Sequence, residues 1–146
     1  MNTVSFFNGA AIVRIIRHED YRGIHVFKKN ENSYIVNDKS IIYIKYSQKR
    51  LPPWNYTFIK EHVSDLVAMA DEFDDVFIVL ICNEDGICCL NWHEFNTVIS
   101  VENNQYPKWI SVTRKKSEKY SIRGRDGELK HKIGNIDFPH KIFPNH

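Results

Sequence analysis

The chain has 146 residues, a net charge of +2, and 42% hydrophobic and 26% charged residues. This length suits one domain that buries a core without disulfide staples, and the composition is that of a globular rather than a disordered protein. No basic region followed by an apolar run opens the chain, and no apolar run approaches the ~18 residues of a membrane span. We therefore expect a soluble, cytoplasmic protein without a membrane partner.

Three cysteines, Cys82, Cys88 and Cys89, lie in apolar runs. Their odd number and spacing match neither a zinc site nor a redox pair, and such thiols are typical of a reducing compartment. A cysteine nucleophile paired with His93 is disfavoured, because apolar surroundings disfavour the thiolate. The seven histidines are scattered without a His-x-x-x-His pair, so we expect no zinc. His62, beside the apolar stripe of a predicted helix, is interpreted as structural.

The first part of the chain predicts a helix and three strands. Asn8 is a candidate cap for a helix that reaches His18. A short strand is expected over 24–27. The stretch 34–47 is rich in Ile, Val and Tyr and is interrupted by the polar turn 37–40, which predicts two more strands. Short polar turns between the three strands indicate an antiparallel meander.

The middle of the chain predicts a linker, a long helix and two strands. Residues 48–55 contain two prolines and are expected to form the linker. Thr57 is a candidate helix cap, and the helix over 58–73 has one apolar stripe at helical spacing. The continuous apolar run over 76–82 is typical of a strand buried on both faces, and residues 87–90 are expected to be its partner strand.

The last part predicts a short helix over 92–99 and strands over 109–114, 120–123 and 129–133. We expect a single α/β (α+β) domain over residues 1–146. Its core, about 8–100, is a mixed central sheet flanked by two main helices, and residues 107–146 form a C-terminal β-hairpin extension.

Basic residues are concentrated in that extension. From Pro107 to His146 there are ten Lys/Arg and four Asp/Glu, which gives 10 − 4 = +6 there and −4 elsewhere. If these charges converge on one face they indicate an anionic partner; otherwise they belong to solvated hairpins whose lysines protect strand edges. The candidate nucleic-acid-binding residues are Arg114, Lys115, Lys116, Arg123 and Arg125.

Three aromatic residues near Lys49 and Arg50 alternate with polar ones: Trp54, Tyr56 and Phe58. If exposed, they are suited to stacking on bases. The more frequent alternative is that such residues belong to the core.

The order helix, three-strand meander, long helix, buried strand and partner strand over residues 8–90 resembles the core of the PD-(D/E)xK, or restriction-endonuclease-like, nuclease superfamily. The resemblance implies an acid on the second strand and an acid-x-Lys on the third, which together hold a divalent metal while the lysine orients or activates water. Lys45 stands where that lysine belongs, but Tyr43 stands where the second acid belongs.

Carried over residue by residue, the resemblance implies Lys45, Asp38 and Glu19 as catalytic residues and Asp38 and Glu31 as magnesium ligands. Asp38 is closer to the lysine than the family usually places its first acid. The structural alternatives are a lysine stem packed on neighbouring tyrosines, a turn aspartate and a surface glutamate.

The first functional expectation is a nucleic-acid-associated protein with a nuclease-like fold. It either hydrolyses phosphodiesters with magnesium or is a catalytically inactive relative that binds DNA or RNA. The alternative is a non-catalytic module that binds a protein partner, such as a subunit or inhibitor in a defence or phage-encoded system. Salt dependence separates the two, because binding through phosphates weakens steeply as salt rises.

Overall fold

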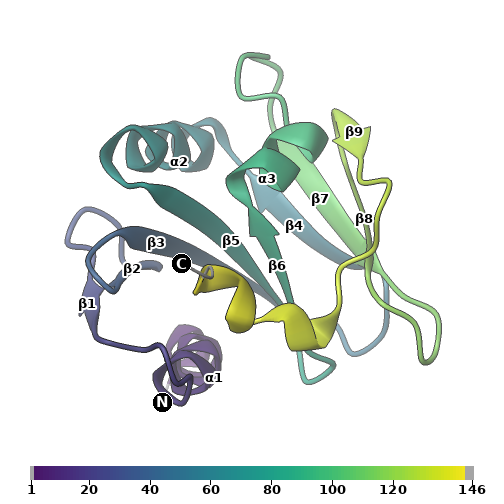
Figure 1. Cartoon of the computed structure of the whole chain (residues 1–146). Helices are drawn as coiled ribbons and strands as arrows, with labels where there is room; N and C mark the ends of the chain where they lie inside the picture. The colour runs from purple at the N-terminus through teal and green to yellow at the C-terminus, as the bar shows by residue number, and fades with distance from the viewer. Residues whose placement is uncertain (1, 144–146) are drawn as a thin grey trace.

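The structure is a computed structural model that describes residues 2–143, which form two β-sheets and three α-helices (Figure 1). In chain order the elements are α1 (Thr3–Ile16), β1 (Ile24–Val26), β2 (Ser33–Val36), β3 (Ser40–Ser47), β4 (Trp54–Phe58), α2 (Lys60–Glu72), β5 (Asp75–Cys82), β6 (Ile87–Asn91), α3 (Trp92–Val98), β7 (Lys108–Thr113), β8 (Ser121–Gly124), β9 (Gly127–Glu128) and the 3-10 helices η1 (Asn135–Asp137) and η2 (His140–Ile142). Over this part of the chain, none of the helices has both the length and the apolar character to cross a bilayer.

The first sheet is mixed and has the strand order β1-β2-β3-β5-β6. Strands β1, β2 and β3 form the predicted antiparallel meander. Strand β3 then runs parallel to β5, from Ser40 beside Asp75 to Ser47 beside Cys82, and β6 is antiparallel to β5. A parallel pair needs a long crossover, which β4 and α2 provide here. The predicted fold class and the buried strand with its partner are therefore confirmed.

The turn between β2 and β3 fixes the register of β3. Asn37 and Asp38 have φ of 53° and 62°, and two consecutive residues with positive φ make the turn type whose twist suits hairpins; Lys39 is one extra residue before pairing resumes. Val36 consequently lies opposite Ser40. Because side chains alternate along a strand, Tyr43 and Lys45 then share one face of the sheet.

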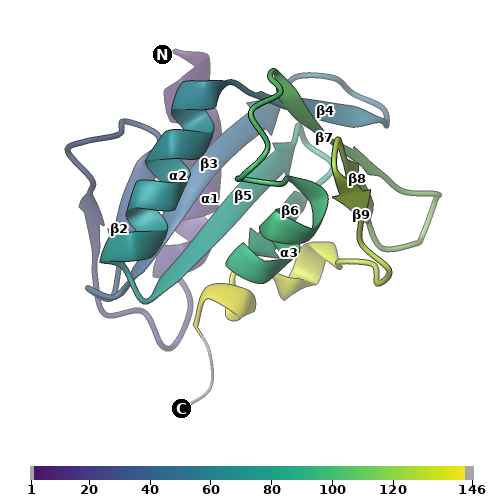
Figure 2. The same cartoon turned by 90° about the horizontal axis from the view of Figure 1, so that it is seen from above.

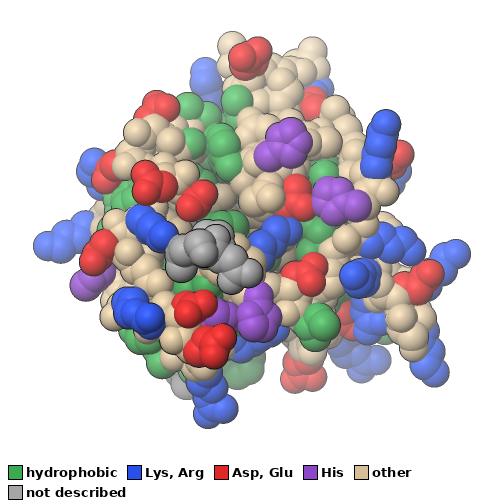
Figure 3. Space-filling view, in the orientation of Figure 1, with side chains coloured by type: hydrophobic (Ala, Val, Ile, Leu, Met, Phe, Trp, Pro, Cys, Tyr) green, Lys and Arg blue, Asp and Glu red, His purple; other side chains and the backbone are tan. Residues whose placement is uncertain are grey.

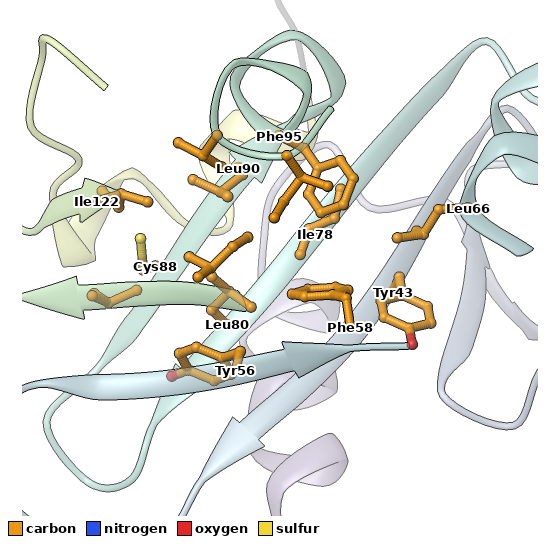
Figure 4. Packing of buried hydrophobic residues seen from close by; sticks show 14 of the residues in the cluster. Tyr43, Tyr56, Phe58, Leu66, Ile78, Leu80, Cys88, Leu90, Phe95 and Ile122 are labelled. Carbon is orange, nitrogen blue, oxygen red and sulfur yellow. The ribbon is translucent and has the colours of Figure 1, made fainter. Parts of the chain in front are cut away.

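Each face of the first sheet is covered by different elements (Figures 1 and 2). Helix α1 and the C-terminal 3-10 helices cover one face, where Phe7, Ala11 and Ile15 pack against Ile42 and Ile44. Helices α2 and α3 and the second sheet cover the other face. Figure 4 shows the interlocked side chains of that larger core, which include Tyr43, Phe58, Leu66, Leu80 and Phe95.

The second sheet has the order β4-β7-β8-β9 and is amphipathic. Its inner side chains are buried in the larger core: Trp54, Tyr56, Phe58, Ile110, Val112 and Ile122. The aromatic residues of 54–58 are therefore core residues, as the more frequent alternative had it. The side chains that alternate with them form what we call the outer face: Asn55, Thr57, Trp109, Ser111, Thr113, Ser121 and Arg123.

The predicted start of the first helix is wrong. Helix α1 begins at Thr3, and Asn2 caps it by accepting a 2.8 Å hydrogen bond from the Ser5 amide. Asn8 lies inside the helix, where it is buried and its Nδ2 donates to the Tyr34 hydroxyl at 3.2 Å. The longer helix leaves an apolar stripe exposed on its solvent side: Phe6, Val13 and Ile16.

Two other predicted boundaries are wrong. The last residues of the predicted linker begin strand β4, so Thr57 is a strand residue and α2 is preceded by Ile59. Residues 129–133 do not form a strand; β9 has two residues, and only an isolated bridge joins Tyr120 to Ile133.

The segment after Pro107 is part of the core rather than an extension of it. Strand β7 pairs with β4 from Val112 beside Trp54 to Lys108 beside Phe58. Ile110 and Val112 thereby complete the larger core.

Candidate functional site

Lys45 is half-buried on the α2 face of the first sheet. Its Nζ lies 4.8 Å from the centre of the Phe58 ring and 5.8 Å from that of Tyr43. Burial lowers the pKa of Lys45 from 10.5 to about 8, because the charged form loses hydration there. The head of Lys45 thus lies near aromatic rings, and it also meets a specific partner rather than only water.

That partner is His62, in the first turn of α2. Lys45 Nζ lies 3.2 Å from His62 Nδ1, and the Ile59 amide donates to the same nitrogen at 3.3 Å. With two donors pointing at it, Nδ1 acts as the acceptor and the ring proton is assigned to Nε2. Burial, followed by the charge of Lys45, lowers the pKa of His62. The lowered pKa favours the neutral imidazole, whose Nδ1 accepts hydrogen bonds.

Asp65, a carboxylate also on α2, acts on His62 through its charge. Asp65 accepts a 3.3 Å hydrogen bond from Asn30 Nδ2. Burial raises the pKa of Tyr43, and the charge of Asp65 raises it further. The Tyr43 hydroxyl consequently stays neutral.

Lys45 also lines an open cleft of about 330 Å³ between the two sheets. The cleft lies where β3 extends beyond β2, since Tyr43 is the last β3 residue paired with β2. Its walls come from α1, β3 and β4 and from the loop before β2, in the order Val4, Asn32, Ile44, Lys45, Tyr46, Asn55, Tyr56 and Thr57. Asn55 and Thr57 belong to the outer face, so the cleft opens beside it.

The predicted catalytic acids do not gather around Lys45. Asp38 lies in the β2–β3 turn, is 87% exposed and forms a 3.4 Å ion pair with His25. Between Ser40 and Lys45 alone the strand rises by roughly 16 Å. Glu19 follows α1 on the opposite face of the sheet and is exposed. Glu31 is exposed in the β1–β2 loop, at the same end of β3 as Lys45 but outside the cleft walls.

The donor set around Lys45 is poor in carboxylates. Strand β2 carries no acid, and Tyr43 occupies the position two residues before Lys45. Among residues 2–143, no three His, Cys, Asp or Glu side chains come together as a metal-binding group. Magnesium prefers several oxygen ligands, so the residues beside Lys45 do not fit the predicted ion.

Lys45→Met is expected to raise the free energy of unfolding at pH 7 by about 1–2 kcal/mol, because an apolar chain replaces a charge without a carboxylate partner. The folded protein holds its proton on Lys45 less tightly than the unfolded chain does. The gain is therefore full below pH 8 and disappears as pH rises from about 8 to 10.5. Urea unfolding at several pH values measures it. Lys60→Met, at an exposed position of α2, is the control and should show no such pH dependence.

The ten basic residues after Pro107 divide into two equal groups. Five are paired with a carboxylate: Lys108 and Arg125 with Asp126, Arg114 with Asp85, Lys132 with Glu118 and Lys141 with Glu94. Within residues 2–143 the other five have no such pair: Lys115, Lys116, Lys119, Arg123 and Lys130. Of the predicted nucleic-acid-binding residues, Arg114 and Arg125 are thus engaged within the protein.

The five cations without a carboxylate lie around the outer face. Lys115, Lys116 and Lys119 belong to the loop that joins β7 to β8, which we call the basic loop (114–120). Figure 3 shows Lys and Arg side chains gathered at the lower right, over this loop and the segment that follows β9. Arg123 lies on the outer face, with its Cζ 5.7 Å from the centre of the Trp109 ring.

A second open cleft, of about 370 Å³, crosses the outer face of β7 and β8. Hydroxyl groups of Ser111, Thr113 and Ser121 line it together with Arg123 and Lys130. One acidic residue also lines it. This is Glu128 of β9, which is the backbone register partner of Arg123 in β8. Hydroxyl donors, cations and an exposed indole are thus brought together on one face.

The three thiols do not provide a nucleophile. Cys82, Cys88 and Cys89 are free and buried. Burial raises the pKa of Cys82 and of Cys89 to about 12, so the thiolate is scarcely populated near neutral pH.

No protein-family model, no curated protein and no solved structure matches this chain. The two clefts and the outer face are therefore the features of the molecule that bear on its function.

Proposed function

We propose that this chain is a nucleic-acid-associated protein that binds a single strand of DNA or RNA on its outer face. The carrying observation is the exposed Trp109 beside Arg123, on the same sheet whose β7 strand leads into the lysines of the basic loop, which have no carboxylate partner among residues 2–143. A nucleic-acid strand matches both features of this surface, because its phosphates pair with cations and its bases stack on aromatic rings.

The shape of the surface favours a single strand over a duplex. The outer face is a β-sheet surface with short hydroxyl side chains, on which an unpaired base can lie flat against Trp109. A duplex hides its base faces in the stack and would meet only the lysines. We therefore expect preference for unpaired strands.

The proposal concerns binding rather than magnesium-dependent hydrolysis. A nuclease-like arrangement remains a proposal for the first sheet, with Lys45 as its one matching residue. Asp38 and Glu19 lie away from that lysine, so cleavage has little support. The cytoplasm is the proposed location, because three buried free thiols suit a reducing compartment.

The test is fluorescence anisotropy with labelled single-stranded DNA, single-stranded RNA and duplex DNA. Changing Lys115, Lys116 and Lys119 together to Ala is expected to weaken single-strand binding about tenfold at ~50 mM salt and to reduce the salt slope by about 2, at ~0.7 per lost phosphate contact. The charge-matched control changes the exposed Arg17, which follows α1, and the exposed Lys28 and Lys29, which lie in the loop between β1 and β2, and it should keep the slope.

Equal losses in the two triple variants would contradict the proposed surface. If no oligonucleotide binds at low salt, a protein-binding role becomes the better explanation. The exposed apolar stripe of α1, with Phe6 and Val13, would then be the surface to change next.

A further inference from the structure

Lys45 is one of the residues that line the cleft beside the outer face, and the groups around its amine suit covalent chemistry. Lys45 lines the cleft, and its head contacts His62 and two aromatic rings rather than a carboxylate. An ion pair would hold such an amine in its charged, unreactive form. Here the contacting acceptor is a neutral imidazole, and the Phe58 ring excludes water from one side.

We propose that Lys45 is a nucleophilic amine that condenses with the aldehyde of a ligand seated in this cleft. Neutral Nζ attacks the carbonyl carbon, a C–N bond forms, and His62 Nδ1 accepts a proton from the nitrogen. That proton passes to the alkoxide formed from the carbonyl oxygen and gives the carbinolamine hydroxyl. The second nitrogen proton follows the same route through His62, and the hydroxyl leaves as water, so amine and aldehyde give an imine and one water molecule. His62 is a positioning residue that also transfers the proton.

The charge state of the amine supports this chemistry. With its pKa lowered to about 8 by burial, Lys45 is neutral in about a tenth of molecules at pH 7, against well under a thousandth for an ordinary lysine. The groups around Nζ are His62 on α2, the Phe58 ring on β4 and the Tyr43 ring on β3, while the uncharged Asn55 and Thr57 line the cleft with Lys45 and the nearest charged residues of α2 are Glu61 and Asp65. Among residues 2–143, no carboxylate forms an ion pair with Nζ.

Two sources of aldehyde are chemically equivalent at Lys45. One is a small sugar aldehyde, and the other is the open-ring sugar of a nucleic-acid strand that has lost a base. The second source depends on the proposed function, since Asn55 and Thr57 connect the cleft to the outer face where a strand would lie. A base-free sugar also lacks the base that would obstruct its entry.

The experiment is borohydride trapping, which reduces an imine to a stable amine that peptide mass spectrometry locates. The probes are a single-stranded oligonucleotide with one abasic site and, separately, 2-deoxyribose 5-phosphate. We expect the adduct on Lys45, formed about tenfold faster than on an exposed lysine at pH 7. It should be lost in Lys45→Arg and Lys45→Met and retained in Lys60→Arg. In His62→Gln the rate should fall while anisotropy shows unchanged strand binding.

An adduct spread over exposed lysines, or retained in Lys45→Met, would overturn the proposal. A strand that binds by anisotropy without an adduct above that of Lys60 would also overturn it and would leave the proposed function intact. If 2-deoxyribose 5-phosphate labels Lys45 and no strand binds, the amine chemistry stands and the proposed function fails. Mapping the adduct in the unchanged protein makes the test independent of how well the variants fold.

Discussion

Glu94→Gln is expected to lower the free energy of unfolding by about 3 kcal/mol, because it breaks a buried, hydrogen-bonded ion pair. The Glu94 side chain is 7% exposed. Its Oε1 lies 2.6 Å from Lys141 Nζ and accepts from the Asn91 amide at 2.9 Å, while its Oε2 lies 2.6 Å from His131 Nε2. One carboxylate therefore connects the start of α3 to two points of the C-terminal segment.

The loss is large because of what remains after the substitution. Lys141 is 18% exposed, and its other hydrogen bond goes to the carbonyl oxygen of Cys89 at 2.8 Å. Without Glu94 its charge stays buried and has no carboxylate beside it. The neutral amide retains the shape of the side chain, so the effect is electrostatic rather than a cavity.

Urea unfolding of Glu94→Gln and of the unchanged protein measures this effect. Burial opposes ionisation, but the hydrogen bonds from Lys141, Asn91 and His131 lower the pKa of Glu94 below 4.5. Its contribution is therefore present above pH 4.5 and lost as pH falls through the lowered pKa, where the two proteins should converge. Glu118→Gln breaks the exposed pair with Lys132 and should cost below about 1 kcal/mol. Equal losses in the two variants would contradict this account.

Trp109→Ala is expected to weaken single-strand binding by about 1–3 kcal/mol, or roughly 5- to 150-fold, which is the usual cost of losing one base–aromatic stack. Trp109 is 38% exposed on the outer face, whereas Trp54 is fully buried. Arg123 Cζ lies over the Trp109 ring at 5.7 Å from its centre, so a base would stack on the exposed part of the indole. Trp109→Phe keeps a stacking surface and should lose much less.

Anisotropy titrations with the same oligonucleotides measure this change. Val26→Ala is the control. Val26 is 66% exposed, but it lies in β1, an edge strand of the first sheet, whereas the outer face belongs to the second sheet. Binding should also quench the fluorescence of Trp109. A Trp109→Ala protein that binds as tightly as the unchanged protein would contradict stacking on the outer face.

The parts of the fold that local sequence could predict are those with a clear hydrophobic pattern or a clear turn signal. The positive-φ turn at Asn37 and Asp38, the apolar stripe of α2 and the continuous apolar run of β5 each contain their own signal. The N-terminal helix was predicted six positions late at its cap, because Asn2 and Asn8 are equally good caps by residue type. Only packing distinguishes them, since Asn8 is buried against Tyr34.

Long-range contacts account for what the sequence did not predict. Strand β4 follows two prolines and is completed by β7 from the far end of the chain. The contact of Lys45 with His62 depends on how α2 crosses β3, so His62 was interpreted as structural. The sequence signal available for His62 was its position at the border of the apolar stripe of α2. Trp109 was predicted within a strand, but its exposure depends on which face that strand buries.

The basic residues after Pro107 show most clearly that sequence alone does not reveal long-range contacts. The tail excess of +6 was correctly counted, but Lys108 is fully buried and pairs with Asp126. Arg114 and Asp85 form a two-point ion pair between segments distant in the chain. Sequence alone cannot separate such engaged cations from those of the basic loop.

The most direct test of binding on the outer face is the salt dependence of single-strand affinity, measured by anisotropy between about 50 and 200 mM salt. The five cations without a carboxylate partner predict that log K falls linearly with log salt with a slope of about −3.5, at ~0.7 per phosphate contact. Loss of about 2 from that slope in the Lys115, Lys116 and Lys119 triple variant would locate the contacts on the basic loop. A slope near zero, or no binding at the lowest salt, would contradict nucleic-acid binding by this surface.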